Sequence, residues 1–218
     1  MCIRDRGGVC AAVDAVLAGQ APNAFVAMRP PGHHTERAKA MGFCIFNAIA
    51  IGALRALDHH GLDRVAVLDF DVHHGNGTQD LLWNEPRALF ASTHQHPLYP
   101  GTGAAGERGA HGQILNVPLQ AGTGGDPARA AWRGICDRVL AWRPQLVLVS
   151  AGFDAHAQDP LASLAWDEAD FTAITRMICD AATSCSAPVV SVLEGGYDLA
   201  ALGRSVRAHV EVLRETTA

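Results

Sequence analysis

Short runs of apolar residues recur along the chain at the length of β-strands. These runs lie at residues 24–28, 65–70, 88–93, 114–119, 146–152 and 189–195. Segments with the apolar spacing of amphipathic helices fall between several of them, at residues 46–60, 126–142, 167–184 and 199–214. Strands that are apolar throughout and alternate with helices indicate a mostly parallel sheet covered on both faces. The pattern therefore predicts an α/β protein with three layers, α/β/α.

Length and composition indicate one domain. With 218 residues, 49% of them apolar, the chain can bury one sizeable core and is short for two. The first six residues, MCIRDR, lack periodicity and lead abruptly into a helical pattern at residues 7–19. We therefore expect residues 1–6 to be a non-native or disordered leader and residues 7–218 to form a single domain.

Charge, cysteine usage and hydropathy restrict the expected partners and compartment. A net charge of -5 gives no general attraction to nucleic acids or anionic membranes. The six cysteines include no C-x-x-C pair and indicate reduced thiols. No apolar run reaches the roughly 18 residues of a membrane span, and no signal peptide is recognisable. We expect a cytoplasmic protein with neither nucleic-acid nor membrane partners, and the oligomeric state stays open.

Polar side chains follow four of the predicted strands. Residues 29–34 include two histidines, Asp71 and His73 follow the second apolar run, and Asp154 and Tyr197 follow the last two. Ligands of open parallel sheets bind beyond the carboxyl ends of the strands. We therefore expect these groups to meet at one edge of the sheet.

The spacing of Asp69, Asp71 and His73 points to a metal site. Residues two apart on an extended chain face the same way, so Asp71 and His73 can share one ion while Asp69 lies deeper and orients them. Asp154 would complete an Asp2His set with an open position, which is typical of catalytic zinc sites. A separate base is then required, and His33 and His34 are the candidates.

Tyr197 adds a possible oxyanion donor, because it follows two glycines that let the backbone turn. Metal, base and donor together describe hydrolysis of an amide or ester. Each residue also has a structural alternative: the paired histidines as loop residues, Asp154 as a helix N-cap, and Tyr197 as a packing residue. Joint placement at one edge of the sheet favours the catalytic interpretation.

Several motifs in this chain occur in the order found in histone deacetylase-like enzymes. They are RPPGHH, GFCIFN, DFDVHHGNGTQ, YPGTG, NVPL, SAGFDAHAQDP and LEGGY. The resemblance covers residues 7–214 and is closer to class II enzymes and bacterial acetylpolyamine amidohydrolases than to class I. It implies the arginase–deacetylase fold and zinc-dependent hydrolysis of N-acetyl-lysine, on a peptide, or of a small N-acetylated amine. The chain would then be a catalytic domain that lacks the N-terminal part of the family.

The resemblance also assigns roles to individual residues. One zinc ion per chain would lie on Asp71, His73 and Asp154, and Tyr197 would polarise the acyl carbonyl. His34 would be the more direct general base and His33 its electrostatic or acid partner. The supporting residues implied are Asp69 behind His33, Asn76 behind His34, a substrate tunnel of Gly42, Phe43, Tyr99 and Leu161, and a structural K+ site that includes Ser92 and Thr93.

Two features bear on the substrate. Tyr99 stands where many family members have Phe, which adds a hydroxyl to the tunnel wall. Relatives that accept cationic polyamines often carry an acidic residue near the position of Leu161, so the neutral side chain favours acyl-lysine or a neutral small amide.

Three rival functions remain open. The same scaffold hydrolyses other amides or esters, and a two-metal ureohydrolase shares the fold but needs further Asp and His ligands. The third is an inactive remnant that binds only metal or acyl groups.

Overall fold

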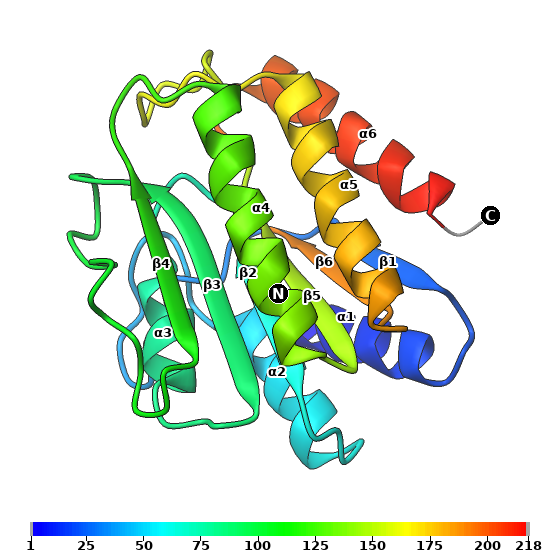
Figure 1. Cartoon of the computed structure of the whole chain (residues 1–218). Coiled ribbons are helices and arrows are strands. Elements are labelled where there is room, and N and C mark those ends of the chain that lie inside the picture. The colour runs from blue at the N-terminus through cyan, green and yellow to red at the C-terminus, as the bar shows by residue number, and fades with distance from the viewer. Residues whose placement is uncertain (1, 217–218) are drawn as a thin grey trace.

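The computed structural model describes residues 2–216 and contains six strands and six helices (Figure 1). The strands are β1 (Asn23–Val26), β2 (Val65–Asp69), β3 (Ala88–Gln95), β4 (Ile114–Leu119), β5 (Leu146–Ala151) and β6 (Val189–Leu193). The helices are α1 (Cys2–Leu17), α2 (Ala48–Asp58), α3 (Asn76–Leu82), α4 (Gly125–Trp142), α5 (Glu168–Ser184) and α6 (Leu199–Glu215).

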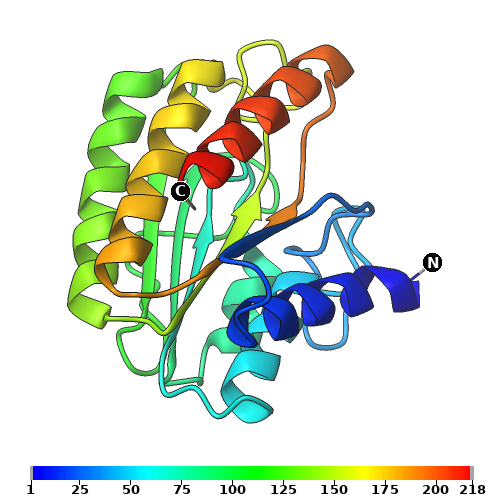
Figure 2. The same cartoon turned by 90° about the vertical axis from the view of Figure 1, so that its right-hand side faces the viewer.

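All strand pairs in the sheet are parallel, in the order β1-β6-β5-β2-β3-β4. Helices α4, α5 and α6 cover one face, and α1, α2 and α3 lie on the other (Figures 1 and 2). The predicted three-layer α/β/α fold is confirmed. No helix in the described part of the chain is long and apolar enough to cross a membrane.

Two apolar cores flank the sheet. Beneath α4, α5 and α6 the largest buried side chains are aromatic, and the ring of Phe70 lies edge-on to those of Trp132 and Phe153. On the opposite face, aliphatic side chains of α1 and α2 pack on the sheet, with Ile49 and Val67 fully buried. Burial on both faces explains why the central strands carry continuous apolar runs.

Two segments of the chain differ from the elements predicted for them. Residues 2–6, expected to be a leader, continue the backbone of α1, while their foreign origin stays a prediction. Helix α3 was not predicted, because its sequence NGTQDLL reads as the polar end of a strand motif.

Candidate active site

The candidate residues come from four strands that are neighbours in the sheet, β1, β6, β5 and β2. Residues 29–34 follow β1, Asp71 and His73 follow β2, Asp154 follows β5 and Tyr197 follows β6. Because the strands are parallel, the four segments that follow them all begin at the carboxyl ends of the strands, on the same side of the sheet. The structure therefore brings together groups that are up to 168 residues apart, as between Arg29 and Tyr197, whose guanidinium lies 5.5 Å from the ring centroid.

Asp71, His73 and Asp154 form a compact buried group, with one ligand atom from each within 4.8 Å of the others. His73 Nδ1 lies 3.2 Å from Asp71 Oδ1 and 3.1 Å from Asp154 Oδ2. This is the only group of at least three potential metal ligands found among the described residues.

The surroundings of this group fit a divalent cation. Burial, and then the neighbouring Asp71 charge, raise the pKa of Asp154 to about 6. Burial would lower the pKa of His73, yet hydrogen bonds to the two carboxylates raise it to about 10. A Cβ on Gly152 or Gly195 would lie 2.0 Å from Asp71 Oδ2 or 2.1 Å from Asp154 Oδ2, so glycine is needed beside both carboxylates. Two buried carboxylates closed in by backbone need a compensating positive charge, and together with His73 they could hold a metal ion.

His33 lies behind this group and is held as a cation. Its Nδ1 is 2.9 Å from Asp69 Oδ2, and its Nε2 is 3.7 Å from Asp71 Oδ1. Burial opposes protonation, but the charges of Asp69, Asp71 and Glu194 hold the pKa of His33 well above its usual value. The predicted contact between Asp69 and His33 is present in the structure.

His34 is held in the neutral form with a defined tautomer. Asn76 Nδ2 donates to Glu36 Oε1 at 2.7 Å, so Asn76 Oδ1 faces His34 Nδ1, at 2.8 Å. An amide oxygen only accepts, which places the proton of His34 on Nδ1 and leaves Nε2 as an acceptor. Burial and the charge of His33, at a ring distance of 4.1 Å, lower the pKa of His34 to about 3.

A pocket of about 380 Å³ opens over these groups. Its walls consist of His34, Gly42, Phe43, His73, Tyr99, Leu161 and Tyr197. Burial and the charges of Asp71 and Asp154 raise the pKa of Tyr197, so its phenol stays protonated and is a hydrogen-bond donor. The neutral imidazole of His34, the protonated phenol of Tyr197 and the candidate metal ligand His73 therefore border one cavity.

Comparison with known proteins identifies the family. The sequence model described as "Histone deacetylase domain" matches residues 1–213. The chain belongs to the histone deacetylase domain family. The predicted resemblance is thus confirmed.

Individual relatives agree with this assignment. A histone deacetylase-like amidohydrolase of Pseudomonas aeruginosa is 46% identical over 197 residues, which cover 88% of this chain and 52% of that protein. An uncharacterized protein of Synechocystis is 46% identical over 206 residues, covering 93% of this chain and 64% of that protein. The crystal structure of the HDA15 HD domain superimposes with a TM-score of 0.91 at 36% identity, covering 96% of this chain and 60% of that one. The chain therefore spans about half to two thirds of the length of these relatives.

The four residues expected to form a substrate tunnel, Gly42, Phe43, Tyr99 and Leu161, line this pocket, and their contact with a substrate stays a prediction. Gly42 has a φ of 55°, and a Cβ there would lie 2.2 Å from His34 Cδ2, so glycine permits the close approach. Phe43 is 69% exposed and Tyr99 and Leu161 are each 45% exposed, which makes the outer rim largely apolar.

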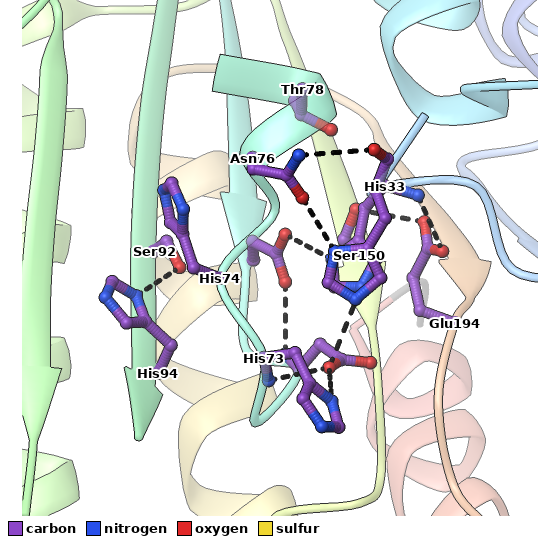
Figure 3. Close-up of polar contacts among 12 residues, drawn as sticks. His33, His73, His74, Asn76, Thr78, Ser92, His94, Ser150 and Glu194 are labelled. Atoms are coloured by element: carbon purple, nitrogen blue, oxygen red, sulfur yellow. Dashed lines mark hydrogen bonds and ion pairs between the residues drawn. The ribbon is translucent and has the colours of Figure 1, made fainter. Parts of the chain in front are cut away.

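The two residues expected near a monovalent cation are buried on β3, which lies next to the edge strand β4. Ser92 is the register partner of Asp69, and its Oγ lies 3.0 Å from His94 Nδ1 (Figure 3). Thr93 Oγ1 accepts a hydrogen bond from Trp132 Nε1 at 3.1 Å. Only Ser92 lies directly beside Asp69 in the sheet, and the cation site stays a prediction.

The sequence did not reveal the acidic residue that holds the histidine segment. Glu194 is fully buried, and its carboxylate accepts the backbone N–H groups of Gly32 and His33 at 2.6 and 3.1 Å (Figure 3). Burial raises the pKa of Glu194 to about 7. Its place in the LEGGY motif was visible in the sequence, but nothing there shows that it contacts residues more than 160 positions away.

Proposed function

We propose that this domain is a zinc-dependent deacylase that hydrolyses the amide of N-acetyl-lysine or of a small N-acetylated amine. The observation that carries the proposal is the shared pocket of His34, His73 and Tyr197. The family assignment and the relative described as an amidohydrolase support it.

Asp71, His73 and Asp154 would hold the zinc ion, one per chain. Zinc bound there would act as a Lewis acid toward the acyl carbonyl and ease deprotonation of the attacking water. A structural K+ beside Ser92 and Thr93 and a cytoplasmic location belong to the same proposal.

The two histidines would have different roles. His34 is neutral and presents an unprotonated Nε2, so it accepts the proton of the attacking water. His33 stays protonated and stabilises the negative charge that develops nearby. The proton held by His34 then passes to the leaving amine as the C–N bond breaks, which yields a carboxylic acid and a free amine.

Tyr197 stabilises the oxyanion formed when water attacks the carbonyl, because its phenol is protonated and borders the pocket. Phe43 and Tyr99 would flank the alkyl chain of acyl-lysine. Leu161 at the rim offers no charge to a second ammonium group, which favours acyl-lysine or a neutral amide over an acetylpolyamine.

A substrate panel tests this proposal. The zinc-loaded and the chelator-treated protein are assayed on an acetyl-lysine peptide, an acetylpolyamine and a simple ester, with bound zinc counted by elemental analysis. We expect zinc-dependent hydrolysis of the peptide, weaker turnover of the polyamine and one zinc per chain. Two metal ions per chain would favour a ureohydrolase, ester turnover alone another hydrolase, and one zinc without any turnover an inactive remnant.

A further inference from the structure

Asp159 is a buried carboxylate that holds two walls of the pocket together. It is 7% exposed and lies on the loop after β5. Its Oδ1 accepts the backbone N–H of Leu161 at 3.0 Å, and its Oδ2 accepts that of Tyr197 at 2.7 Å. Leu161 and Tyr197 both line the pocket, although 36 positions separate them in the sequence.

The carboxylate of Asp159 is satisfied by backbone N–H groups. The N–H of Asp198 adds a third contact with Oδ2, at 3.4 Å. None of the ion pairs among the described residues includes Asp159, so these hydrogen bonds are what stabilise its burial.

Tyr197 depends on its backbone for its position. It follows Gly195 and Gly196, and the φ of Gly196 is 134°, a conformation that L side chains rarely adopt. Its ring lies near two exposed residues, Arg29 and Phe43, the latter at a ring-centroid distance of 6.0 Å. Within residues 2–216 no hydrogen bond is found to its phenol hydroxyl. The hydrogen bond from the backbone N–H of Tyr197 to Asp159 therefore holds the residue whose phenol borders the pocket.

We propose that Asp159 is a positioning residue that couples the rim at Leu161 to the oxyanion donor Tyr197. The expected effect on kcat rests on the proposed deacylase function. The coupling of the segments at Leu161 and Tyr197 rests on the structure alone.

Asp159→Asn is the informative variant, because it keeps size and shape. A carboxylate accepts on both oxygens, whereas an amide presents one oxygen and one NH2 group. The backbone N–H of either Leu161 or Tyr197 must then face the NH2 group of the amide. The segment that carries this N–H loses its hydrogen bond. Asp167→Asn is the matched control: Asp167 also accepts two backbone N–H groups, at 2.9 and 3.1 Å, but it caps α5 and does not line the pocket.

Amide hydrogen exchange tests the coupling without any substrate. In Asp159→Asn we expect peptides covering residues 160–163 or 195–199 to exchange about tenfold faster, the scale of one lost hydrogen bond. Asp167→Asn should leave both peptides unchanged. Unchanged exchange in both peptides of Asp159→Asn would overturn the proposal.

A double-mutant cycle tests whether Asp159 acts through Tyr197. On an acetyl-lysine peptide we expect Asp159→Asn to lower kcat about 10-fold to 100-fold in the wild-type background. In a Tyr197→Phe background the same change should cost less than about threefold, because the group being positioned is gone. Equal losses in both backgrounds would show a general structural effect and overturn the proposal. A wild-type protein that hydrolyses no acyl substrate would refute the proposed function, while hydrogen exchange would still decide the coupling.

Discussion

At the residue scale, the orientation of one amide decides which nitrogen of His34 carries the proton. Glu36 accepts from Asn76 Nδ2, and the amide oxygen is thereby turned toward His34 Nδ1. The family resemblance of the sequence had implied Asn76 as the residue behind His34. The role of Glu36 was not, because a contact across 40 positions leaves no local signal.

Replacing Asn76 tests this arrangement. Asn76→Ala removes the acceptor, so His34 loses its fixed tautomer, and we expect kcat for an acetyl-lysine peptide to fall about 10-fold to 100-fold. Asn76→Asp keeps an acceptor at the same place and should retain most of that activity. Steady-state kinetics at equal zinc content provide the measurement, and equal rates in Ala and wild type would contradict the assigned role of the amide.

The candidate metal ligands stand out in the sequence because their signal is local, and their binding of a metal stays a prediction. Asp71 and His73 lie two residues apart after an apolar strand, and Asp154 follows a second one. Asp159 carries no such signal, since its partners at Leu161 and Tyr197 are backbone N–H groups that no side-chain pattern reveals.

At the element scale, α3 shows where periodicity fails. Its seven residues include buried Asn76, Thr78 and Gln79, so its polar side faces inward. Tertiary contacts hold it: the N–H of Thr78 donates to the carbonyl of His33 at 3.1 Å, and Asn47 Nδ2 donates to Thr78 Oγ1 at the same distance. A short helix stabilised in this way has too little apolar spacing for recognition from sequence.

Helices α5 and α6 and strand β6 meet at one buried histidine. His209 Nδ1 lies 2.7 Å from Thr175 Oγ1, and Nε2 lies 2.8 Å from Ser191 Oγ. Thr175 also donates to the carbonyl of Phe171 at 2.7 Å, which leaves Nδ1–H of His209 as donor to Thr175 and Nε2 as acceptor from Ser191. Burial lowers the pKa of His209 to about 3.

The lowered pKa of His209 predicts that the free energy of unfolding depends on pH. The unfolded chain protonates His209 below its ordinary pKa of about 6.5, whereas the folded chain resists protonation until about pH 3. The unfolded state is therefore favoured as pH falls through this window, by about 2 kcal/mol between pH 7 and pH 5.

Denaturant unfolding of wild type and His209→Gln across pH 7 to 5 measures the effect. Subtracting the variant profile from the wild-type profile removes the contributions of other titrating groups. We expect the wild type to lose about 2 kcal/mol more than the variant over this range. Parallel profiles would show that His209 does not titrate as its burial predicts.

At the scale of the whole molecule, the layers were predictable and the strand order was not. Apolar runs alternating with helical spacing define an α/β/α protein. The order β1-β6-β5-β2-β3-β4 depends on which strand edges pair, and strands with similar apolar composition do not encode that choice locally.

The buried carboxylates link metal binding to global stability. Zinc at about 1,000 times its Kd would stabilise the folded chain by about 4 kcal/mol, which corresponds to a Tm increase of about 10 °C for a domain of this size. Thermal unfolding with zinc and with a chelator measures this shift. In His73→Ala the shift should be much smaller, and an equal shift there would place the stabilising metal elsewhere.

Hydrolysis of an acetyl-lysine peptide by the zinc-loaded protein and by Tyr197→Phe is the decisive test of the proposed deacylase function. We expect turnover in the wild type and a loss of about 100-fold to 1,000-fold in the variant, because the oxyanion loses its phenol donor. Zinc content and Tm should match in the two proteins. Equal turnover by the wild type and the variant would contradict the role of Tyr197. A folded wild type with one bound zinc and no turnover would contradict the deacylase function.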